Sequence, residues 1–135
     1  MSDLGFDWEA VVHKPVTAVV GRKERRMSDG SLAWDALAFA VGDRAVVLTV
    51  TADTDEIEVT HENVPNGGGW KSVTALEGTV GKPLGWCWVG RNYRGYRDSF
   101  TFALGDVLPD ALEPHLTFLA EGSSLRCFNL TLVAA

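Results

Sequence analysis

Apolar and polar residues alternate along three stretches of the chain, and each stretch is followed by a bend and a second alternating stretch. The pairs cover residues 32–41 and 44–51, residues 86–89 and 99–104, and residues 116–120 and 125–133. A period of two residues is typical of β-strands, and Gly, Asn or Asp at each bend supplies the backbone angles of tight connections. The sequence therefore predicts three antiparallel hairpins, and residues 16–20 and 56–60 predict two further strands.

Helical patterns are scarcer. Residues 7–13 predict one short helix capped by Asp7, and residues 71–80 predict a second that ends at Gly81. Residues 108–114 lie between two prolines and have room for about one turn. We therefore expect an α+β fold, with a mainly antiparallel sheet and one or two short helices packed on one face.

Length and composition indicate one globular domain over residues 1–135. Hydrophobic residues make up 46% of the chain and charged residues 22%, which excludes a disordered protein. A chain of this length buries enough surface to fold without a disulfide or a metal. The glycine-rich residues 65–69 are interpreted as a loop inside this domain.

The net charge of −6 makes nucleic acid an unlikely partner, because nucleic-acid-binding domains usually carry a basic surface. The first residues do not resemble a secretory signal, and no apolar stretch is long enough to cross a membrane. Cys87 and Cys127 are expected to be buried free thiols. These features predict a cytoplasmic protein that does not associate with membranes.

Known catalytic and metal-binding patterns do not fit the chain. The acidic residues 53–62 fail the spacing of a calcium-binding loop, because Ile57 and Glu58 stand where an oxygen ligand and a glycine are required. They fit the solvated face of a strand better. Trp70 interrupts the glycine–lysine spacing of a phosphate-binding loop. No catalytic residue, metal ligand or cofactor is therefore predicted.

The segment 91–98 is the most unusual in composition, because three arginines and two tyrosines gather at one hairpin tip. Arg and Tyr dominate many protein interfaces, so this tip is a candidate binding surface. Its members are Arg91, Tyr93, Arg94, Tyr96 and Arg97. A purely structural interpretation stays open, in which Asn92 and Gly95 make the turn and Asp98 pairs with an arginine.

Three tryptophans, Trp34, Trp86 and Trp88, follow strand periods and are expected mainly in the core. If some of them line a pocket instead, Tyr96, Asp35 and Arg97 would complete an aromatic site with a few polar groups. Asp35 alternates with apolar residues, so it needs a charged or hydrogen-bonded partner or a place at the sheet edge.

Three motifs together resemble a family of small uncharacterised bacterial proteins. They are Asp53-Thr54-Asp55-Glu56-Ile57, then Gly81-Lys82-Pro83-Leu84-Gly85-Trp86-Cys87-Trp88, and Asn92-Tyr93-Arg94-Gly95-Tyr96-Arg97-Asp98. The resemblance covers about a third of the chain and implies a bacterial origin, but it brings no catalytic residue.

Two functional hypotheses follow from the sequence. The first is a non-catalytic module that binds an unidentified protein, by analogy with small proteins such as toxin-neutralising immunity proteins. A homodimer is compatible with it. The alternative is a small-molecule-binding protein or enzyme with an aromatic-lined pocket that contains Asp35 and an arginine. A deep pocket around Asp35 would favour the second hypothesis, and a flat apolar surface edged by arginines would favour the first.

Overall fold

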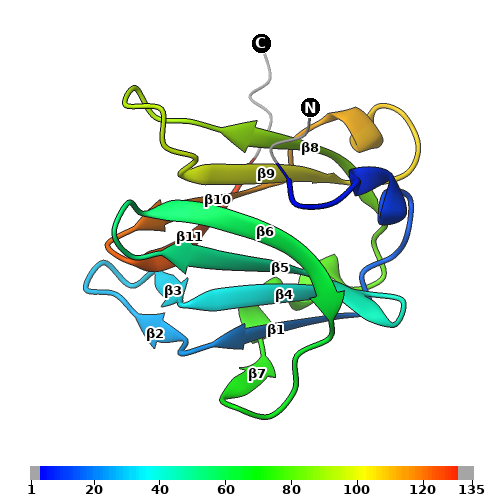
Figure 1. Cartoon of the computed structure of the whole chain (residues 1–135). Helices are drawn as coiled ribbons and strands as arrows, with labels where there is room; N and C mark the ends of the chain where they lie inside the picture. The colour runs from blue at the N-terminus through cyan, green and yellow to red at the C-terminus, as the bar shows by residue number, and fades with distance from the viewer. Residues whose placement is uncertain (1–3, 131–135) are drawn as a thin grey trace.

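The computed structural model describes residues 4–130, and these form two antiparallel sheets that pack face to face (Figure 1). The five-stranded sheet has the order β6-β5-β4-β1-β7, and the six-stranded sheet has the order β2-β3-β11-β10-β9-β8. The first sheet contains β1 (Ala18–Arg22), β4 (Ala36–Val41), β5 (Arg44–Thr51), β6 (Glu56–Asn63) and β7 (Trp70–Ser72). The second contains β2 (Arg25–Arg26), β3 (Leu32–Trp34), β8 (Leu84–Gly90), β9 (Ser99–Leu104), β10 (Leu116–Glu121) and β11 (Ser124–Asn129).

The mainly antiparallel architecture predicted from the sequence is confirmed. The three predicted hairpins correspond to β4–β5, β8–β9 and β10–β11, and the two further strands correspond to β1 and β6. In β6, Ile57 and Val59 are buried while Glu58 and Glu62 are exposed, as the alternation predicted. Residues 131–133 of the third predicted hairpin lie outside the described residues.

The structure differs from the expected fold in what covers the sheets. Phe39 on β4 packs against Phe102 on β9 and Phe118 on β10, with ring centroids 5.2 and 5.6 Å apart. Each sheet therefore buries the apolar face of the other, in the manner of a β-sandwich. The helical segments of the described chain are only short 3₁₀ helices: η1 (Trp8–Ala10), η2 (Thr74–Thr79) and η3 (Asp110–Leu112).

The strand predicted over residues 32–41 is split at Asp35. Residues before it pair with β11 in one sheet, and residues after it pair with β1 and β5 in the other. Here the backbone N–H of Asp35 donates to the carbonyl of Arg22 at 3.0 Å. Trp34 and Leu37 both reach the shared core across this break. Alternation along an unbroken strand would have placed them on opposite faces.

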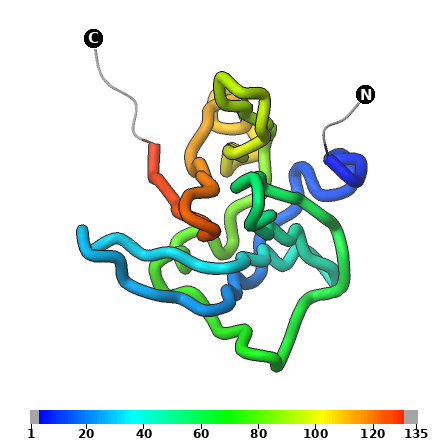
Figure 2. Tube along the Cα trace, turned by 60° about the vertical axis from the view of Figure 1, so that its left-hand side comes forward, coloured from blue at the N-terminus to red at the C-terminus, as the bar shows by residue number. Residues whose placement is uncertain are grey.

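The predicted helices are shorter than expected. Asp7 does cap the first, because its carboxylate accepts a hydrogen bond from the N–H of Glu9 at 3.1 Å. The start of the second is instead strand β7, which pairs with the free edge of β1. Val73 and Leu76 are nevertheless buried, as their spacing predicted. Figure 2 shows the β2–β3 hairpin and the connection between β6 and β7 projecting from the body of the molecule.

The N-terminal segment closes the gap between β6 and β8, the edge strands of the two sheets. The Phe6 ring lies 5.1 Å from the imidazole of His61 on β6. Trp8 packs edge-on against Phe100, and its indole N–H donates to the carbonyl of Gly85 on β8 at 2.8 Å. One end of β8 is therefore covered by this segment.

Close packing at Gly85 gives a test of the fold. A Cβ at this buried position would lie 2.6 Å from the carbonyl oxygen of Ala111 and 2.9 Å from the Cβ of Ala103. We expect Gly85→Ala to lower the free energy of unfolding by ~1–3 kcal/mol in chemical denaturation, because the backbone of η3 must shift. Gly78→Ala is the control, since a Cβ there meets open space. Equal effects of the two substitutions would contradict this packing.

Candidate functional site

Three turns from the two sheets meet at one end of the sandwich (Figure 1, left). They are the β5–β6 turn at residues 52–55, the β8–β9 loop at residues 91–98 and the β10–β11 turn at residues 122–123. Together they surround an open depression of about 530 Å³. Asp53 and Asp55 line it from the first turn, Arg94 and Tyr96 from the loop, and Glu121 from the end of β10.

The β8–β9 loop is organised around the side chain of Asn92. Its carbonyl oxygen accepts hydrogen bonds from the backbone N–H groups of Arg94 and Tyr96, at 2.9 and 3.3 Å. Its amide group donates to the carboxylate of Asp98 at 3.3 Å. Gly95 has a φ of 89°, a conformation that glycine adopts without strain. Asn92 and Gly95 therefore form the bend of the loop, and the carboxylate of Asp98 holds the bend by accepting the hydrogen bond from the Asn92 amide.

Glu56 attaches this loop to the five-stranded sheet. Its carboxylate accepts a hydrogen bond from the backbone N–H of Arg97 at 3.1 Å and another from the hydroxyl of Thr54 at 2.9 Å. The N–H of Ile57 in turn donates to the carbonyl of Arg97 at 2.7 Å. The hydrogen bond from Arg97, then that from Thr54, lowers the pKa of Glu56, and the charges of Arg97 and Arg91 add to this effect.

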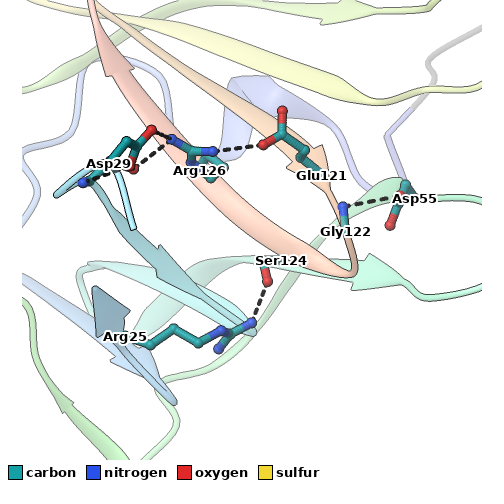
Figure 3. A network of polar contacts seen from close by, with 8 residues as sticks. Arg25, Asp29, Asp55, Glu121, Gly122, Ser124 and Arg126 are labelled. Atoms are coloured by element: carbon teal, nitrogen blue, oxygen red, sulfur yellow. Dashed lines mark hydrogen bonds and ion pairs between the residues drawn. The ribbon is translucent and has the colours of Figure 1, made fainter. Parts of the chain in front are cut away.

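Asp55 attaches the third turn to the same place. Its carboxylate oxygens accept hydrogen bonds from the backbone N–H of Ser123 at 2.7 Å and from that of Gly122 at 3.2 Å, the second of which is drawn in Figure 3. Asp55 itself has a φ of 51°, an uncommon left-handed conformation for a residue other than glycine. The β8–β9 loop also contacts β10 directly, because the N–H of Ala120 donates to the carbonyl of Asp98 at 2.8 Å.

A second polar network continues from this turn along the outside of the six-stranded sheet (Figure 3). The Arg126 guanidinium bridges Glu121 at 2.7 Å and Asp29 at 3.1 Å. The hydroxyl of Ser31 and the hydrogen bonds of this network lower the pKa of Asp29 to about 2. Arg25 donates to the hydroxyl of Ser124 in the same region. The β2–β3 hairpin is thereby joined to the β10–β11 turn.

The predicted binding residues of the loop differ in their exposure. Tyr93 is 96% exposed and Tyr96 is 37% exposed, while Arg91 and Arg94 are also on the surface. Arg97 is half-buried, and Arg91 donates a hydrogen bond to the carbonyl of Gly95 at 3.2 Å. Tyr93, Arg94 and Tyr96 therefore form an outward-facing surface, which we call the tip surface.

The other predicted residues form two pairs that lie far apart, Trp34 with Asp35 and Trp86 with Trp88. Trp34 is buried in the core, where its indole N–H donates to Glu24 at 2.9 Å. Asp35 pairs with Arg25 at 3.0 Å and with Lys23 at 3.9 Å, rather than with Arg91 or Arg97. Trp86, 56% exposed, and the half-buried Trp88 are on β8. β8 is the fourth strand from β3 in the order of the six-stranded sheet, which corresponds to roughly 19 Å. Trp34 and Asp35 therefore cannot line one small pocket together with Trp86 and Trp88.

A comparison with protein families identifies the group to which this chain is related. The model of the DUF6334 family, described as a family of unknown function, matches residues 1–134. The chain belongs to the DUF6334 family. No curated protein and no solved structure matches it. The resemblance to an uncharacterised family, inferred from short motifs, is thus confirmed at the level of the whole chain.

Two of those motifs meet in the structure. In the first segment, Glu56 holds the loop formed by the second segment, Asn92 to Asp98, while the neighbouring Asp55 holds the β10–β11 turn. From the sequence, residues 53–62 were expected to form only a solvated strand face, so the two carboxylates were missed as positioning residues. The signal available in the sequence was that both segments belong to the same set of motifs.

The cysteines lie outside this site. Cys87 and Cys127 are free, as expected, but they are half-buried rather than fully buried. Burial raises the pKa of Cys87 to about 11 and that of Cys127 to about 12, so both thiols stay protonated at neutral pH. Within residues 4–130, no three metal-ligating side chains are grouped to hold an ion. No helix in the same range is long and apolar enough to cross a membrane.

Two neighbouring substitutions separate the tip surface from the bend that supports it. Arg94→Ala should change the free energy of unfolding by less than about 0.5 kcal/mol, because the side chain is exposed. Gly95→Val should destabilise the protein by ~1–2 kcal/mol or more, because a β-branched residue is strained at a φ of 89°. Chemical denaturation measures both, and equal stability losses would mean that Arg94 is part of the structural framework.

The lowered pKa of Glu56 predicts a pH dependence. Because folding favours the ionised carboxylate, its stabilisation is present above the ordinary pKa of 4.5 and is lost as the pH falls through the lowered value. Glu56→Gln should therefore be less stable than the wild type at neutral pH, and the difference should shrink in acid. Thermal melts of both proteins between neutral and acidic pH measure it, and a constant difference would contradict this role.

Proposed function

We propose that this protein is a non-catalytic protein-binding module whose contact surface is the tip surface of Tyr93, Arg94 and Tyr96. The observation that carries the proposal is that Tyr93 is 96% exposed on a loop held by hydrogen bonds to Glu56 on β6 and to Ala120 on β10. A tyrosine ring that is almost wholly in water contributes little to the fold itself. Tyr and Arg are enriched at protein interfaces, where few residues supply most of the binding energy.

The attachment of the loop supports this proposal through its effect on binding entropy. Asn92, Glu56 and Asp98 fix the loop before any partner arrives. A contact surface that is already ordered loses less conformational freedom on binding. The fitting partner is a protein that offers an apolar recess for the Tyr93 ring and a carboxylate for the Arg94 guanidinium.

The surroundings of the tip favour a protein partner over nucleic acid. The depression beneath it is lined by the carboxylates of Asp53, Asp55, Asp98 and Glu121, in a chain with a net charge of −6. Such a field repels phosphate groups. The small-molecule alternative lacks support, since Asp35 and Trp34 are distant from Trp86 and Trp88. A bacterial cytoplasm fits the proposal, because Cys87 and Cys127 are unpaired.

A capture experiment tests the proposed function. The wild-type chain, the double variant Tyr93→Ala/Arg94→Ala and the control Val80→Ala/Lys82→Ala serve as baits in a lysate of the source cells. The control residues are also exposed but precede the opposite end of β8. We expect the tip variant to lose a protein that the other two baits retain, with binding weakened by ~1–3 kcal/mol in calorimetry. Identical capture by all three baits would contradict the proposal.

A further inference from the structure

The outer edge of β8 is unlike the other sheet edges of the described chain. β2 and β7 have two and three residues and carry Arg25, Arg26 and Lys71, and β6 carries Glu56, Glu58 and Glu62. Short length and charge are the usual protection of an edge strand against pairing with another chain. β8 has seven residues, Leu84–Gly90, and none of them is charged or a proline.

Among residues 4–130, contacts cover the first part of this edge. The N–H and carbonyl of Leu84 bond to Lys14 and His13, and the carbonyl of Gly85 accepts the indole N–H of Trp8. β8 pairs with β9 from Cys87 to Gly90 on one side, after an irregularity in the register between Leu84 and Cys87. On the other side, no strand within residues 4–130 pairs with Trp86 to Gly90. Trp86 is 56% exposed at the start of this open stretch. Five residues of uncharged backbone are thus available for pairing.

We propose that this open edge pairs antiparallel with the same edge of a second copy of the chain, so that the two six-stranded sheets become continuous. The proposal goes beyond the protein-binding function, because it uses the edge of β8 rather than the tip surface. A two-fold axis perpendicular to the sheet leaves every side chain on the same face in both copies. Because side chains alternate between the faces, two residues can face each other across the new edge only if both numbers are even or both are odd.

The open stretch is self-complementary in one register. All five residues pair only when Trp88 faces Trp88 of the second copy, which places Trp86 opposite Gly90 and Cys87 opposite Val89. The bulky indole of Trp86 then lies beside a residue without a side chain, and the two Trp88 rings form an aromatic cross-strand pair. A shift of the register in either direction leaves part of the stretch unpaired or meets the end covered by Trp8 and Lys14.

The charged residues near the ends of the open stretch also favour pairing with a second copy. In this register Arg91, one residue beyond β8, comes opposite Gly85 of the other chain. Glu9 lies beside that position, since it lines the same small depression as Trp8 and Trp86, together with His13. Each dimer would bring together two such pairs of opposite charge. The uncharged β8 lets two chains approach closely although each has a net charge of −6.

Sedimentation velocity over a roughly hundredfold range of protein concentration tests the dimer. We expect the wild type to dimerise and Trp88→Lys to raise the dissociation constant at least about tenfold, because two like charges would face each other. Phe128→Lys is the matched control: Phe128 is an exposed aromatic in the same row of the same sheet, reached from Trp88 through Thr101 and Thr117. Circular dichroism verifies that both variants are folded.

A second measurement tests the register and does not depend on the fold of the lysine variant. Trp88→Cys should form a covalent dimer when oxidised glutathione takes two electrons and two protons from the facing thiols, since directly opposed strand residues have suitable Cα separations. Trp86→Cys faces Gly90 and should not. The proposal would be overturned if the wild type were monomeric or if Trp88→Lys and Phe128→Lys had the same dissociation constant. Equal cross-linking of the two cysteine variants would also overturn it.

Discussion

Asp55 and Glu56, two neighbouring carboxylates at the entrance to β6, are the contacts on which the candidate site depends. Glu56 receives the backbone of the β8–β9 loop, and Asp55 receives the backbone of the β10–β11 turn. Hydrogen bonds from N–H groups to carboxylates are stronger than those between neutral groups. One short segment of the five-stranded sheet thereby fixes two turns of the other sheet. Without it, the β8–β9 loop and the β10–β11 turn would lose these carboxylate contacts to the five-stranded sheet.

The hydrogen bonds of Asp55 and Glu56 can form because the two sheets are already packed against each other. Phe39 packs against Phe102 and Phe118, which holds β4 against β9 and β10 of the other sheet. A close-packed core has low compressibility, so it keeps the two sheets in one relative position. The molecule then offers two outward features of different chemistry: a charged and aromatic tip surface, and the uncharged edge of β8. The proposed partner protein and the proposed second copy would each use one of these two features.

The sequence predicted the local features of the fold better than its long-range ones. The period of two identified the hairpins β4–β5, β8–β9 and β10–β11, because a strand with one buried face alternates apolar and polar residues. It did not identify the β2–β3 hairpin or the pairing of β5 with β6. The break at Asp35 was not predicted, since alternation counts residues and does not show where a strand leaves its sheet. Helix over residues 71–80 was wrong at its start, because the free edge of β1 offers Trp70–Ser72 a ladder of hydrogen bonds that no local pattern reveals. The roles of Asp55 and Glu56 depend on partners 41 to 68 residues away, which the acidic pattern alone cannot indicate.

The central claim is that the β8–β9 loop is ordered before any partner binds. Backbone ¹⁵N relaxation of the free protein tests it most directly, by comparing the order parameters of Tyr93 to Tyr96 with those of β9 and β10. The hydrogen bonds of Asn92, Glu56 and Asp98 predict values for the loop near those of the strands, about 0.85. Values below about 0.6 would show a flexible loop and contradict the account.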